Sequence, residues 1–171
     1  MNISILTPLE SNNEWFIYIN EVLEKKFSEF GHKVNQIFFR EINLELIKTL
    51  NNSNSDFYLS QSGIGSDINI FGEWDGPKNY WDVTKKKICN LHFDHPFHCL
   101  QNHMLDTENA LHIYSCGSYF TAAKLFCKKT KSNILLSPNP LLVDEKKKNK
   151  TEGNYFVIIK NLFLYKDFSE K

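Results

Sequence analysis

The segment 91–103, LHFDHPFHCLQNH, holds the side chains of this sequence that are best suited to chemistry. It contains four histidines together with Asp94, Pro96 and Cys99. Histidine gains and loses a proton near neutral pH, and histidine, aspartate and cysteine are all common metal ligands. The segment therefore indicates an acid–base site, a metal site, or a histidine-rich strand end without a chemical role.

A metal site would require several of these side chains to converge. The candidate ligands are His92, His95, His98, His103, Asp94 and Cys99. His92 and Asp94 alternate with Phe93 on a predicted strand and therefore share one of its faces. Pro96 prevents the helical i, i+4 spacing of an HExxH site, and the later histidines belong to a different element. We therefore expect no metal ligands here, with a metal-dependent hydrolase built on the histidine cluster as an alternative.

Asp94 and His95 are the predicted catalytic pair. An aspartate at a strand end, held by the rigid Pro96, has a fixed direction and can orient the neighbouring imidazole as a general base for a hydroxyl group. In another interpretation, Asp94 only caps a helix that begins at Pro96. A third interpretation gives the histidines no chemical role, with His92 packed in the sheet and His103 on the surface.

Strands and helices are predicted to alternate along the chain. The predicted strands are 2–7, 34–39, 56–62, 87–93, 108–116 and 133–138, and the predicted helices are 15–30, 42–50 and 117–129. Continuous apolar strands alternating with helices are typical of a parallel sheet that is covered on both faces. The sequence therefore predicts a doubly wound, mainly parallel α/β fold.

The first predicted helix has the clearest boundary signals. Ser11 and Glu14 have the spacing of a capping box, and Gly31 is placed to end the helix in a left-handed conformation. The expected buried stripe consists of Trp15, Ile19, Val22, Leu23, Phe27 and Phe30.

Ligands of doubly wound folds bind beyond the carboxyl ends of the strands. The segments that follow the predicted strands should therefore gather along one edge of the sheet. The predicted substrate contacts there are Thr7, Ser62, Gly63, His98, Cys116 and Gly117. Two alternatives remain open: the glycines at 63 and 65 can form a plain turn, and Cys116 can be an ordinary buried thiol. Trp74 and Trp81 can stack on a sugar or on each other.

Composition excludes several classes of partner. Twenty acidic residues balance 20 basic ones, which gives no reason to expect nucleic acid or an anionic membrane as a partner. The longest apolar run is far below the roughly 20 residues that span a bilayer. The four cysteines form no CxxC pair and no secretory signal is recognised, so we expect a reducing cytoplasm.

The order of these features resembles the N-terminal Rossmann-like half of GT-B glycosyltransferases, especially bacterial members of the spore-maturation CgeB type. The resemblance depends on a first strand ending at Thr7-Pro8, a helix closing at Gly31-His32-Lys33-Val34, and a strand ending at Asp94-His95-Pro96. A strand ending at Ser115 and the element 137–140, SPNP, complete it. The chain departs from many relatives because no glycine-rich loop follows the first strand.

This resemblance implies an acceptor-side domain over residues 1–150. It further implies that 151–171 are a linker and the start of a truncated second domain, which would bind the nucleotide-sugar co-substrate. The implied reaction is a metal-independent, base-assisted sugar transfer to a sugar or glycan acceptor, with no other cofactor. The chain alone would then be inactive, and a non-catalytic binding module of the same fold is a further alternative.

Overall fold

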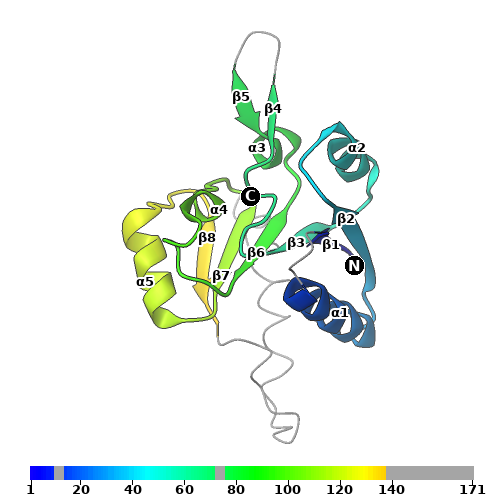
Figure 1. The fold of residues 1–171 in the computed structure, drawn as a ribbon, viewed down its shortest axis with the longest axis horizontal. Coiled ribbons are helices and arrows are strands. Elements are labelled where there is room, and N and C mark those ends of the chain that lie inside the picture. The colour runs from blue at the N-terminus through cyan, green and yellow to red at the C-terminus, as the bar shows by residue number, and fades with distance from the viewer. Residues whose placement is uncertain (10–13, 72–75, 138–171) are drawn as a thin grey trace, which may run out of the picture. The chain divides into compact units, whose positions relative to one another are not determined.

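Six parallel strands form the central sheet of the protein (Figure 1). They are β1 (Asn2–Pro8), β2 (Lys33–Phe39), β3 (Phe57–Gln61), β6 (Ile88–His92), β7 (Ala110–Tyr114) and β8 (Asn133–Leu136), in the order β2-β1-β3-β6-β7-β8. The chain reverses its direction of winding between β1 and β3. In open parallel sheets this switch point is the usual ligand-binding crevice.

The structure is a computed structural model that describes residues 1–9, 14–71 and 76–137. Residues Met1–Leu136 form one compact unit that contains every helix and strand of the described residues. The predicted linker and second-domain start, and the predicted boundary near residue 150, lie outside the described residues. Among the described helices, none is long and apolar enough to cross a membrane.

Helices cover both faces of the sheet. The helices are α1 (Glu14–Glu29), α2 (Leu44–Asn52), α3 (Tyr80–Thr84), α4 (Leu100–His103) and α5 (Gly117–Phe126). Asn20 of α1 bonds to Thr7, whereas Leu46 and Leu50 of α2 pack in one cluster with Leu6. Because neighbouring strand residues point to opposite faces, α1 and α2 lie on opposite sides (Figure 1). The prediction of a doubly wound, mainly parallel α/β fold is confirmed.

The buried stripe of α1 is shorter than predicted. Ile19, Leu23 and Phe27 are buried, but Trp15 is 56% and Phe30 50% exposed. The prediction was wrong for these two residues because only the central turns of the helix pack on the sheet. Gly31 has the predicted left-handed backbone, with φ +80°, while the capping residue Ser11 lies outside the described residues.

Between β3 and β6 the chain contains three elements that the sequence did not indicate. Strands β4 (Asn69–Phe71) and β5 (Pro77–Asn79) form an antiparallel hairpin that leads into α3 (Figure 1). Trp81 of α3 is fully buried, and its indole nitrogen donates to the Gly65 carbonyl at 2.8 Å. Trp81 is therefore a core residue and is not available to stack on a sugar, and Trp74 lies outside the described residues.

Candidate active site

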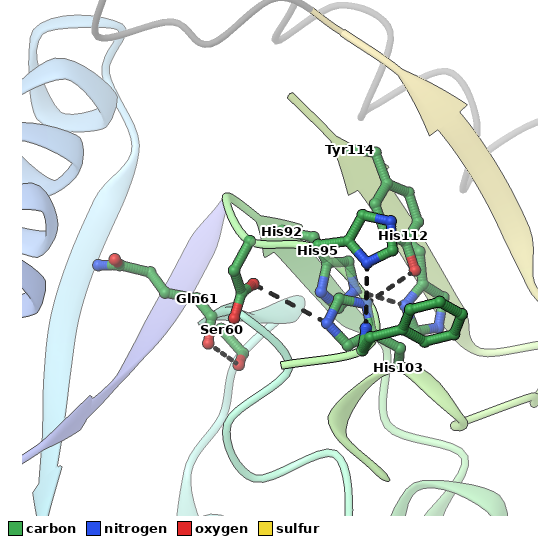
Figure 2. A network of polar contacts seen from close by, with 9 residues as sticks. Ser60, Gln61, His92, His95, His103, His112 and Tyr114 are labelled. Atoms are coloured by element: carbon green, nitrogen blue, oxygen red, sulfur yellow. Dashed lines mark hydrogen bonds and ion pairs between the residues drawn. The ribbon is translucent and has the colours of Figure 1, made fainter. Parts of the chain in front are cut away.

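Four buried rings gather at the carboxyl ends of β6 and β7, as Figure 2 shows. His92 ends β6, His112 and Tyr114 lie on β7, and His103 ends α4. His92 is paired with Tyr114 in the sheet register, so alternation places all three strand residues on one face. The centroid of the His92 ring lies 4.1 Å from that of His103, 5.2 Å from that of His112 and 4.5 Å from that of Tyr114.

Hydrogen bonds assign the proton positions on two of these imidazoles. His112 Nε2 lies 2.9 Å from the Leu105 carbonyl oxygen, which can only accept, so this nitrogen carries the proton. Burial lowers the pKa of both His92 and His112, so both rings are neutral at pH 7. The bare His112 Nδ1 therefore accepts from His92 Nε2 at 2.8 Å, and His92 Nδ1 keeps a free lone pair.

Asp94 and His103 complete the polar side of the cluster. One oxygen of Asp94, Oδ1, lies 3.8 Å from His103 Nε2, and His103 Nδ1 lies 3.1 Å from the Tyr114 hydroxyl. Burial lowers the pKa of His103 to about 4, although the charge of Asp94 acts in the opposite direction. The Asp94 side chain is 30% exposed, whereas His103 is fully buried. The cluster therefore reaches solvent at the Asp94 carboxyl group.

A loop after α5 holds the segment around α4 in place. The Lys129 ammonium group donates to the carbonyl oxygens of His103 and Leu105. Asp106 accepts from the backbone amides of Thr130, Lys131 and Ser132 and from the Thr130 hydroxyl. Burial lowers the pKa of Lys129 to about 8. These contacts fix the carbonyl that orients His112 and the backbone that carries His103.

Three residues of the cluster could hold a metal ion. His92, Asp94 and His103 each offer one ligand atom, and the three atoms lie within 4.8 Å of one another. The sequence interpretation argued against a metal site partly because His103 belongs to a different element. That reason was wrong, because α4 folds back over the end of β6. The interpretation that placed His103 on the surface is also wrong, whereas the packing of His92 in the sheet is confirmed.

The structure separates the two members of the predicted catalytic pair. His95 is partly exposed, its Nδ1 accepts from the Phe97 amide at 3.3 Å, and its ring packs edge-on against Tyr119. Asp94 faces His103 and makes no hydrogen bond to His95. The capping interpretation of Asp94 is wrong, because α4 begins only at Leu100 with Cys99 as its N-cap. The catalytic roles of Asp94 and His95 stay predictions.

Three of the predicted substrate contacts are engaged within the fold. Thr7 is buried; its hydroxyl donates to the Gln36 side chain and accepts from Asn20, both at 2.9 Å. The amide of Ser62 donates to the Leu91 carbonyl at 2.6 Å. A Cβ atom on Gly63 would lie 2.1 Å from the backbone oxygen of Asn102 in α4. Here glycine allows close packing of the turn after β3 against α4.

The other three predicted contacts are exposed. His98 lies in a turn closed by a 2.9 Å bond from its amide to the His95 carbonyl. The thiol of Cys116 lies 3.1 Å from the Ser118 hydroxyl, and hydrogen bonds from Ser118 and Tyr119 lower its pKa. Gly117 begins α5. The alternative of an ordinary buried thiol is wrong for Cys116, which is exposed.

Four residues of the site were not indicated by sequence reasoning: His112, Tyr114, Lys129 and Asp106. His112 and Tyr114 did carry a signal, because their i, i+2 spacing on a predicted strand puts two polar rings on one face. Lys129 and Asp106 carried none, since their contacts join segments more than 20 residues apart.

In comparisons with known proteins, no family model, no curated protein and no solved structure matches the chain.

Proposed function

We propose that this chain is the acceptor-side domain of a GT-B type glycosyltransferase of the cytoplasm. The observation that carries the proposal is the position of Asp94, a partly exposed carboxylate two residues after the end of β6, at the carboxyl edge of a parallel sheet. Parallel α/β sheets bind their ligands at this edge. A carboxylate held there suits the removal of a proton from an acceptor hydroxyl.

The hydrogen bond to the His95 ring indicates which member of the pair Asp94 and His95 acts as the base. Its Nδ1 accepts from the Phe97 amide, so in the neutral ring the proton lies on Nε2. His95 is thereby a hydrogen-bond donor, and we assign the role of base to Asp94. In this proposal, His95 orients the acceptor sugar while Asp94 takes its proton. The nucleotide-sugar would be bound mainly by a second domain.

Thermal unfolding with added ligands tests this proposal. We expect acceptor-type mono- and oligosaccharides to raise the melting temperature of the chain, and nucleotide-sugars to have a much smaller effect. Asp94→Asn should remove the stabilisation by acceptor sugars, whereas Glu29→Gln, which neutralises an exposed carboxylate at the end of α1, should preserve it. Equal stabilisation of wild type and Asp94→Asn, or none by any sugar, would contradict the proposal.

A further inference from the structure

We propose that His92, Asp94 and His103 bind a divalent first-row transition metal ion, with Zn²⁺ as the best match. The inference does not depend on the proposed sugar transfer. It follows from the hydrogen-bonding state of three converging atoms.

Unpartnered polar atoms are concentrated in this cluster. Within the described residues, five buried side-chain N or O atoms have no hydrogen-bond partner, and three of them are His92 Nδ1, Asp94 Oδ1 and His103 Nε2. Each unsatisfied buried polar group costs roughly 1–3 kcal/mol. These three atoms, from β6, the segment after it and α4, lie within 4.8 Å of one another. A single cation would satisfy all three.

The hydrogen bonds that connect the Leu105 carbonyl, His112 and His92 form a relay, and this relay favours a ligand role for His92. Metal-bound histidines commonly donate their second ring nitrogen to an acceptor, which fixes the tautomer and the ring orientation. Here the Leu105 carbonyl orients His112, and His112 accepts from His92 Nε2. The lone pair of His92 Nδ1 is therefore left for a ligand. His103 has the equivalent arrangement, with Nδ1 against the Tyr114 hydroxyl and Nε2 free.

Binding requires a small contraction of the cluster. A first-row metal lies about 2.0–2.2 Å from nitrogen and oxygen ligands, so two ligand atoms of one ion are at most about 4 Å apart. Because the three atoms now lie within 4.8 Å of one another, the side chains must approach by up to roughly 1 Å. Rotation of the His103 and Asp94 side chains can supply this movement while the backbone of α4 stays in place. The nearby Lys129 ammonium group opposes the cation, so we expect moderate affinity.

The ligand set indicates the class of metal and its chemistry. Imidazole ligands favour Zn²⁺ and its neighbours over Mg²⁺ and Ca²⁺, and three protein ligands leave a position open for water or substrate. The Asp94 side chain is 30% exposed, so the ligand set lies next to solvent. A metal ion there lowers the pKa of a bound water or hydroxyl, and Asp94 becomes a ligand instead of a base. The chemistry would then fit the metal-dependent hydrolase alternative.

Titration with CoCl₂ tests the inference, because Co²⁺ in a four- or five-coordinate protein site absorbs visible light much more strongly than the hexaaqua ion does. We expect one Co²⁺ per chain, displaced by ZnCl₂. His103→Gln and Asp94→Asn should weaken binding by about 100-fold or more, since even loss of an orienting outer residue costs about 10–100-fold. His98→Gln is the matched control and should bind like wild type.

Nitrogen NMR of the wild-type histidines tests the same inference without relying on a variant that folds. Before addition of ZnCl₂, His92 and His112 should both carry the proton on Nε2. On addition, His92 Nδ1 and His103 Nε2 should shift, while both nitrogens of His98 should not. Absence of stoichiometric binding, or binding that is lost in His98→Gln, would overturn the metal site. Neither result depends on whether acceptor sugars bind.

Discussion

Two clusters of buried polar side chains lie at the carboxyl edge of the sheet. They differ in how many of their polar atoms have a hydrogen-bond partner. At the switch point between β1 and β3, Thr7 and Asn20 are bonded to each other, and Asn20 accepts from Gln61. Among the described residues of that network, only Gln61 Oε1 is a buried side-chain atom without a hydrogen-bond partner. The histidine cluster at β6 and β7 contains three buried side-chain atoms without a hydrogen-bond partner.

This difference separates a structural network from a candidate site. The network of Thr7, Asn20 and Gln61 joins α1 to the sheet, because Gln61 also donates to the Phe16 carbonyl of α1 at 3.0 Å. Contacts within the protein therefore fill the position where folds of this class often bind a ligand. The three unsatisfied atoms of the histidine cluster lie at and beyond the end of the neighbouring strand β6, and we expect the chemistry there.

The largest loss of stability is expected from substitution of Gly63, which packs against α4. The change Gly63→Ala places a methyl group 2.1 Å from the Asn102 oxygen at a φ of +69°. We expect a loss of about 3 kcal/mol or more in the free energy of unfolding, measured by urea denaturation, because backbone must move. Displacement of α4 should also weaken Co²⁺ binding.

Gly31→Ala is the control for that change, because its φ is +80° but a Cβ there meets no atom within 4 Å. We expect Gly31→Ala to lower the free energy of unfolding by about 1 kcal/mol, from backbone strain alone. Equal losses in the two variants would mean that contact with α4 is unimportant.

The switch-point network should affect stability without affecting the histidine cluster. Asn20→Ala leaves the Thr7 hydroxyl and the Gln61 amide short of a partner, so we expect a loss of about 2–3 kcal/mol in the free energy of unfolding. Co²⁺ affinity should stay at the wild-type value. A parallel loss of metal affinity would show that the two groups are coupled and that the comparison fails.

His112 should act on metal binding as a positioning residue. His112→Gln removes the ring that fixes the His92 tautomer, and we expect Co²⁺ affinity to fall about 10–100-fold. Circular dichroism and nitrogen NMR of His92 should show a folded chain whose His92 tautomer is no longer uniform. Unchanged affinity would mean that the relay does not orient the proposed ligand.

The stability of the metal-free chain is expected to depend on pH through His103. The folded pKa of His103, about 4, lies below that of an unfolded histidine near 6.5. The unfolded state therefore binds more protons between these values, and stability falls as pH decreases through this window. We expect the free energy of unfolding to fall by up to about 3 kcal/mol between pH 6.5 and 4, measured by chemical denaturation in the presence of chelator.

His103→Gln should reduce the slope of that pH dependence, and the exposed His98→Gln should leave it unchanged. Stability that does not vary between pH 6.5 and 4 would contradict the buried, neutral state of His103.

Sequence reasoning located the candidate site to a segment but did not assemble it. The strand end at His92 and Asp94 was predicted correctly, because apolar strand cores and a following proline are local signals. The relay through His112 was missed, because its partners come from β6 and the segment after α4. The hairpin β4–β5 was missed because three-residue strands carry too little alternation to recognise.

The sequence by itself determined the parallel α/β sheet, the left-handed end of α1 at Gly31, and the position of Asp94 after a strand. These features follow from periodicity and turn chemistry within short windows of the chain. Only the tertiary structure decided that His103 stacks on His92, that Thr7 is closed off by Asn20, and that Lys129 holds α4. Such contacts join distant segments, and they depend on how strands and helices pack, which no short window contains.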